Sequence, residues 1–107
     1  MAYSGKGLYK WQGRNNINMV SKSGVGPIPP GLYKMGKSYD NPHLGPCTIN
    51  LDPIAHTVTF GRSLFRIHGN NSSNDASHGC IVVPIRGFRE EIARQVELGF
   101  DVIEVIP

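Results

Sequence analysis

Residues 65–83 read FRIHGNNSSNDASHGCIVV, and the interpretation of the whole chain begins with this stretch. Two apolar runs, Leu64–Ile67 and Ile81–Val83, lie on either side of a small polar loop and are typical of strands. His68 directly follows the first run, and Cys80 directly precedes the second. If the two strands are neighbours, they bring an imidazole and a thiol together.

The pair of Cys80 and His68 suits acyl-transfer chemistry. A thiol is a weak nucleophile until it loses its proton, and an adjacent histidine is the usual base that removes it. Gly79 allows close approach of the backbone just before Cys80, so that the amides of both residues can point at a developing oxyanion. The segment therefore predicts a nucleophile, a base and an oxyanion hole.

These residues also resemble a known family. His68-Gly69, followed by Ser77–Ile81 with the sequence SHGCI, is similar to the signature of the L,D-transpeptidase (YkuD-like) catalytic domain superfamily. Gly26–Tyr33, GPIPPGLY, resembles a second segment of that superfamily. Gly61–Gly69, GRSLFRIHG, is especially similar to its compact branch, which includes type VI secretion effectors that target peptidoglycan.

The resemblance implies a fold, an activity and a set of roles. The implied fold is a small, mainly β, L,D-transpeptidase-like β-sandwich, and the implied activity proceeds through a cysteine acyl-enzyme on peptidoglycan stem peptides. Cys80 would be the nucleophile and His68 its general base. The carbonyl of Gly69 would orient the imidazole, and the backbone of His78, Gly79 and Cys80 would stabilise the oxyanion.

The chain departs from the family pattern in two places. His68 and Cys80 are 12 positions apart, a shorter interval than in typical members, so the loop over the site is trimmed. Many members carry an arginine two positions after the cysteine, where this chain has Val82. These departures affect the substrate contacts and the balance between transfer and hydrolysis.

Three further residues are candidates for substrate binding. Arg66 shares a strand face with His68 by alternation, and its guanidinium matches a substrate carboxylate; the alternative is a solvent-exposed strand residue. Ser77 belongs to the motif beside Cys80, and Tyr39 is expected to line the cleft. Asp75, in the polar loop, either orients an imidazole or serves as a turn residue.

The remaining cysteine and histidines have simpler interpretations. Cys47 is expected to pack as a small hydrophobe. A Cys47–Cys80 disulfide is the alternative, although it would consume the nucleophile. A metal site made of His68, His78 and Cys80, with His56 nearby, fits no usual zinc spacing. We therefore expect no metal and no cofactor.

Composition limits the function classes. The 107 residues are 39% apolar, as expected of one globular domain over residues 1–107. No apolar run is long enough to span a membrane, and no apolar segment of a secretory signal peptide is visible. The net charge of +3 indicates either solubility or affinity for anionic cell-wall polymers, and no nucleic-acid-binding motif is present. No coiled-coil pattern appears, so we expect a monomer.

The pattern along the chain predicts a mainly β fold with one amphipathic helix near the carboxyl terminus. The helix is expected over residues 88–98, with Phe88, Ile92 and Val96 on its apolar face, Arg89 among the polar residues largely opposite, and Gly99 as its stop. The other expected elements are a hairpin over 2–20, a loop over 21–30, a strand over 32–35, a turn-rich connection over 37–46, a strand over 47–51 ended by Asp52-Pro53, a hairpin over 57–68 with Gly61-Arg62 as its turn, a strand over 81–83 and an interior strand over 100–106.

The leading functional hypothesis is a cysteine-dependent acyl-transfer enzyme that acts on peptidoglycan stem peptides. It would cleave the L,D bond before the terminal D-amino acid, as an L,D-carboxypeptidase, or exchange that residue, as an L,D-transpeptidase. As an antibacterial effector it would act in the periplasm or cell wall of a target cell, with secretion machinery and an immunity protein as partners. The alternative is a non-catalytic module with the same fold that binds peptidoglycan or a partner protein.

Overall fold

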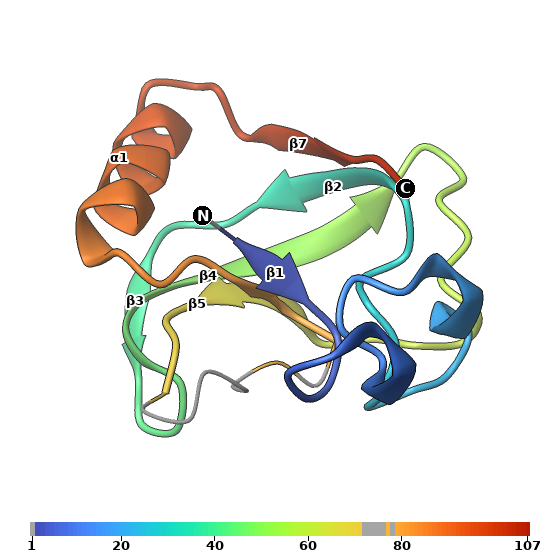
Figure 1. Ribbon diagram of the computed structural model, residues 1–107. Helices are drawn as coiled ribbons and strands as arrows, with labels where there is room; N and C mark the ends of the chain where they lie inside the picture. The colour runs from blue at the N-terminus through green and yellow to red at the C-terminus, as the bar shows by residue number, and fades with distance from the viewer. Residues whose placement is uncertain (1, 72–76, 78) are drawn as a thin grey trace.

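The computed structural model describes residues 2–71, 77 and 79–107 and folds them around one curled β-sheet (Figure 1). The strand order is β1-β6-β5-β4-β2-β7, and β3 pairs with β4 beside this path. The bounds of the strands are β1 Tyr3–Ser4, β2 Gly31–Met35, β3 Tyr39–Asn41, β4 Gly45–Ile54, β5 Phe65–His68, β6 Ile81–Val82 and β7 Val102–Val105. The helices are α1 Arg86–Glu97 and two short 3-10 turns, η1 Lys10–Gln12 and η2 Ile17–Met19. The predicted mainly β fold with a single helix near the carboxyl terminus is confirmed.

Strand β4 is the centre of the sheet and is longer than predicted. It pairs antiparallel with β2, β3 and β5. Asp52-Pro53 does not end it, contrary to the prediction, because Pro53 still pairs with Tyr33 of β2. The β5 pairing stops at Leu51, so the last residues of β4 have a free side where a proline without an N–H is tolerated.

The core lies between the sheet and α1. It is built from alternate residues of the central strands, namely Tyr33, Met35, Ile49, Leu51, Phe65 and Ile67, and α1 adds Ile92, Ala93 and Val96. The rings of Tyr33 and Phe65 meet edge to face with centroids 5.6 Å apart. Burial raises the pKa of Tyr33 to about 12, and its hydroxyl donates to the Pro29 carbonyl at 2.8 Å.

Helix α1 occurs where it was predicted, but its buried face is different. Gly99 follows its end with a φ of +99°, a conformation that glycine adopts easily. Phe88, predicted to face the core, is 53% exposed, whereas Arg89, predicted to face solvent, is 4% exposed. Arg89 is buried because its Nη1 donates to the Val83 carbonyl at 2.7 Å, which ties the first turn of the helix to the chain after β6.

Two predicted hairpins are absent from the structure. In the first, residues 2–20, the strand β1 pairs with β6 and the chain continues through η1 and η2. The reason is local, since Asn15 binds back to Ser4 through both its side chain and its amide. In the second, residues 57–60 form no strand. Phe60 at the end of this stretch and Leu64 after it have positive φ values, and β5 pairs with β4 instead.

Two other predictions concern the sheet margins. The turn-rich connection over residues 37–46 contains the short strand β3, which folds back on β4. The last strand, β7, lies at an edge of the sheet beside β2 rather than in its interior. Its side chains alternate between exposed and half-buried, as an edge strand with one covered face requires.

The predicted loop over residues 21–30 is confirmed as irregular.

Candidate functional site

The strands that carry the predicted nucleophile and base are neighbours. β5 and β6 pair in parallel, with Ile67 opposite Ile81 and His68 opposite Val82. Continued by one residue, this register sets Cys80 opposite Arg66, so Cys80 and His68 are offset by two residues, or about 7 Å along the strands. The inward Ile67 belongs to the core. By alternation, Arg66 and His68 therefore occupy the opposite face of the sheet.

The imidazole of His68 is held in one orientation. It is 2% exposed, and Nδ1 lies 2.8 Å from the carbonyl oxygen of Gly69. A carbonyl only accepts hydrogen bonds, so Nδ1 carries the proton and Nε2 is the basic nitrogen. This contact has the geometry that the predicted role of Gly69 requires.

Cys80 is a free and partly exposed thiol at the start of β6. Its Sγ lies 3.7 Å from the carbonyl oxygen of Leu64, the residue before β5. Cys47 is also free, and it is buried in β4. No disulfide joins the two, so the alternative of a Cys47–Cys80 bridge is not found, and Cys47 packs as the predicted small buried residue.

Ser77 braces the backbone next to Cys80. Its side chain is fully buried, and its hydroxyl donates to the Cys80 carbonyl at 2.7 Å. The same oxygen accepts from the amides of Gly5 at 2.9 Å and Gly79 at 3.2 Å. The Gly79 amide, a predicted oxyanion donor, is thus directed at Ser77 in this structure. His78 and Asp75, two further candidates, lie outside the described residues.

A cleft beside Cys80 brings Arg66 and Tyr39 together. The Arg66 cleft, as we call it, has a volume of about 340 Å³ and is lined by Tyr39, Asn50, Leu51, Asp52, Pro53, Arg62, Ser63, Leu64, Phe65 and Arg66. Asn50 pairs with Arg66 across β4 and β5 and accepts from the Tyr39 hydroxyl at 2.7 Å. Leu64, whose carbonyl touches the Cys80 thiol, lies on its wall.

Arg66 is half-buried, and its Nε has no hydrogen-bond partner among the described residues. Buried polar groups are normally paired, so the unpaired Nε leaves the guanidinium of this cleft residue incompletely satisfied. Arg66 is therefore a half-buried residue in a cleft rather than a solvent-exposed strand residue.

Arg62 is the feature that sequence reasoning missed. It was predicted to be a turn residue, yet it is only 7% exposed. Its Nη1 donates to the carbonyls of Val20 and Pro27, both at 2.6 Å, and its Nη2 to that of Gly26 at 3.2 Å. Burial lowers the pKa of Arg62, and the electrostatic attraction of Tyr33 and Cys80 in their anionic forms opposes that shift.

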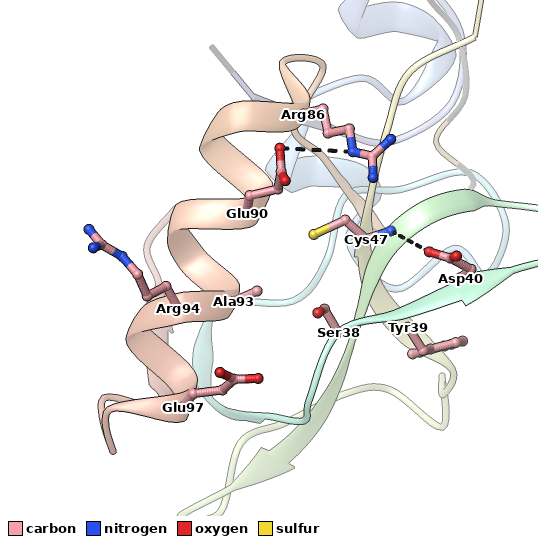
Figure 2. Close-up of a pocket in the computed structure, with 9 residues that line it drawn as sticks. All are labelled: Ser38, Tyr39, Asp40, Cys47, Arg86, Glu90, Ala93, Arg94 and Glu97. Atoms are coloured by element: carbon pink, nitrogen blue, oxygen red, sulfur yellow. Dashed lines mark hydrogen bonds and ion pairs between the residues drawn. The ribbon is translucent and has the colours of Figure 1, made fainter.

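A second cleft lies on the helix side of the sheet (Figure 2). It has a volume of about 320 Å³ and is lined by Ser38, Tyr39, Asp40, Cys47, Arg86, Glu90, Ala93, Arg94 and Glu97. Figure 2 shows the Cys47 sulfur directed toward α1, below the Arg86–Glu90 ion pair of 3.8 Å. This cleft includes neither His68 nor Cys80. The described lining of the Arg66 cleft does not include them either, but that cleft reaches Leu64, whose carbonyl oxygen lies 3.7 Å from the Cys80 thiol.

Two features are absent from the described residues. Outside the unplaced positions, no three histidine, cysteine or acidic side chains are grouped so that they could hold a metal ion. Within the same part of the chain, no helix combines the length and the apolar character needed to cross a membrane. The two histidines outside the predicted site, His43 and His56, are both exposed.

Comparison with known proteins gives one match. The family model of the Tlde1 domain, a type VI secretion effector family, matches residues 1–97. No curated protein and no solved structure matches the chain. The comparisons do not connect it to the L,D-transpeptidase superfamily, so that resemblance stays a prediction. Because the match covers nearly the whole chain, this protein belongs to the Tlde1 domain family of type VI secretion effectors.

Proposed function

We propose that this effector domain is a cysteine-dependent acyl-transfer enzyme that acts on peptidoglycan stem peptides. The observation that carries the proposal is the pairing of β5 with β6, which brings an oriented imidazole and a partly exposed thiol to adjacent strands. A nucleophile and a base held by rigid strands are the minimum that such chemistry needs.

In the proposed reaction, Nε2 of His68 accepts the thiol proton of Cys80. The thiolate attacks the carbonyl carbon of the third stem residue. As the C–S bond of the thioester forms, the C–N bond to the terminal D-amino acid breaks. His68 gives its proton to the departing amine. Water then attacks the thioester, or an amine does so, and the Cys80 thiol is restored. The first outcome is L,D-carboxypeptidase activity and the second is L,D-transpeptidase activity.

The Arg66 cleft supports this substrate class. A stem peptide ends in a carboxylate, and a guanidinium binds a carboxylate through two parallel hydrogen bonds. Arg66 has an unpaired buried Nε in a cleft that reaches the wall beside Cys80. We propose that Arg66 binds the terminal carboxylate, that Tyr39 borders it, and that the buried Ser77 holds the Cys80 loop in position.

The family supports the biological setting. Type VI secretion effectors are delivered into other cells, which is compatible with an antibacterial role. We propose that the domain acts in the periplasm of the target cell and removes or exchanges the terminal residues that crosslinking needs. An immunity protein in the producing cell would be the expected partner of such a toxin.

Mass spectrometry of disaccharide-tetrapeptide muropeptides tests the proposal. The protein is incubated with them alone and with an added D-amino acid, beside a folded Cys80→Ala variant. Loss of the terminal residue indicates the carboxypeptidase, and its replacement indicates the transpeptidase, provided that both require Cys80. If the folded wild-type protein leaves the muropeptides unchanged, the proposal is wrong, and a binding module with this fold becomes the better hypothesis.

A further inference from the structure

Arg62 is a buried cation without a carboxylate partner. Its three hydrogen bonds all go to backbone carbonyls of the segment before β2, and none of the ion pairs among the described residues involves it. Its guanidinium also lies 5.5 Å from the centre of the Phe65 ring. Burial of a charge that lacks an opposite charge is unfavourable, so a nearby group that becomes negative would gain from it.

The group next to Arg62 is the backbone that leads into Cys80. A Cβ atom built on Gly79 would lie 2.2 Å from Nη2 of Arg62, closer than any real contact, so the guanidinium packs directly against this glycine. Gly79 has a φ of +117°, and the next residue is the proposed nucleophile. Arg62 thus connects the Gly26–Pro27 carbonyls to the Cys80 loop.

Arg62 packs against Gly79, so its positive charge lies against the residue directly before Cys80. An opposite charge within a few ångströms favours the ionised form of a thiol. The other titratable or charged groups near Arg62 and Cys80, among the described residues, include Tyr33 in β2, Tyr39 in β3, Asp52 in β4, and both Arg66 and His68 in β5. Tyr33 stays neutral between pH 5 and 9, since burial raises its pKa to about 12.

We infer that Arg62 is the positioning residue of the Cys80 loop and the cation that stabilises the Cys80 thiolate. The inference rests on the proposed function only in taking Cys80 as the nucleophile, and it adds a residue that no motif pointed to. It also explains why Gly79 is a glycine, since any side chain there would displace the guanidinium as well as strain the backbone.

The test is the pH dependence of Cys80 alkylation by iodoacetamide, followed between pH 5 and 9 by peptide mapping, which reports Cys47 separately. In Arg62→Gln, the Cys80 rate at pH 7 should fall by about tenfold, and the profile should move to higher pH. Arg62→Lys, which keeps the charge, should restore most of the rate. His68→Ala separates the contribution of the imidazole from that of Arg62.

A merely structural Arg62 gives a different result. If Arg62→Gln is folded by circular dichroism and its alkylation profile equals that of the wild type, the inference is wrong, whatever happens to its stability. If Arg62→Gln does not fold, Gly79→Ala replaces it, because the added methyl displaces the guanidinium; an unmoved profile in that variant overturns the inference equally.

The alkylation assay uses no peptidoglycan, so the two proposals fail separately. An Arg62-dependent profile with unchanged muropeptides refutes the substrate and supports the role of Arg62. If muropeptides are turned over in a Cys80-dependent way but the pH profile of Cys80 alkylation is the same in Arg62→Gln as in the wild type, the role of Arg62 is refuted and the substrate is supported.

Discussion

Arg62 and Arg89 are two buried arginines that differ in what they support. Each donates to backbone carbonyls, and each packs against a glycine beside a proposed reacting residue. Arg62 lies against Gly79, before Cys80, whereas a Cβ atom on Gly69, after His68, would lie 3.0 Å from Nη1 of Arg89. One buried arginine therefore packs against the glycine next to each residue of the proposed Cys80–His68 dyad.

The two arginines differ in their surroundings and in how completely their guanidinium groups are hydrogen-bonded. Arg62 packs against Gly79, directly before the proposed nucleophile, and makes no ion pair among the described residues. Arg89 joins the start of α1 to the Val83 and Pro84 carbonyls and reaches the Pro46 carbonyl at 3.3 Å, and its Nε is buried without a partner among the described residues. Arg89 therefore connects α1 to the sheet, whereas the role that we infer for Arg62 also includes stabilisation of the Cys80 thiolate.

The largest effect is expected at the residue that Arg62 supports. Cys80→Ala should abolish turnover of muropeptides without loss of fold, because no other group can form the thioester. Cys47→Ala is the matched control and should keep turnover within a factor of a few, since Cys47 is buried in β4 and lines the cleft on the helix side of the sheet. Both are measured by mass spectrometry. Residual turnover in Cys80→Ala would remove the nucleophile assignment.

The next effect separates the two arginines directly. Arg89→Gln and Arg62→Gln should each lower the free energy of unfolding by about 2–4 kcal/mol, because buried carbonyls lose charged donors. Urea unfolding measures this loss. Only Arg62→Gln should also move the alkylation profile of Cys80. If Arg89→Gln moves the alkylation profile of Cys80 as far as Arg62→Gln does, both cations act on the thiol and the proposed difference between the two arginines is wrong.

The two glycines give a smaller contrast. Gly79→Ala should cost about 2 kcal/mol or more, since its φ is +117° and the methyl would meet a guanidinium held by three hydrogen bonds. Gly69→Ala should cost about 1 kcal/mol, because the Arg89 side chain has only to shift by a few tenths of an ångström. Thermal denaturation of both variants gives the order, and the reverse order would contradict the assigned contacts.

The smallest effect is expected at an exposed arginine on the same helix as Arg89. Arg94 binds Glu91 through two hydrogen bonds of 3.0 and 2.8 Å on the surface of α1. These bonds lower the pKa of Glu91, so any stabilisation is present above the pKa of the unfolded state and is lost as the pH falls through the lower folded value. Arg94→Ala should leave the melting temperature at pH 7 almost unchanged, because solvent screens the pair. A large decrease in the melting temperature of Arg94→Ala would contradict the expectation that exposed arginines contribute less to stability than buried ones.

Part of the site could be predicted because it depends on neighbours in the sequence. The alternation of apolar residues placed β5 and β6 on either side of the polar loop, and the carbonyl of Gly69 reaches the ring of the preceding residue, His68. The spacing of Ile92 and Val96 indicated α1, and Gly99 marked its end. Each signal lies within a few residues of the feature it predicts.

Other features could not be predicted because they join distant segments. The hairpin expected over residues 2–20 failed because β1 found its partner in β6, and Phe88 was misassigned because Arg89 had carbonyl acceptors in the chain after β6. Arg62 looked like a turn residue, and only the fold places the carbonyls of Val20 and Pro27 around it.

The sequence by itself determined the secondary structure near the site, the thiol and imidazole at its strand ends and the glycine beside each of them. Alternation, helical period and turn chemistry are local properties of the backbone and are readable residue by residue. The tertiary structure alone decided which strands pair, that Arg66 faces a cleft, and that two arginines are buried against the dyad. Burial and pairing depend on contacts between residues far apart in the chain, and local patterns carry no information about those partners.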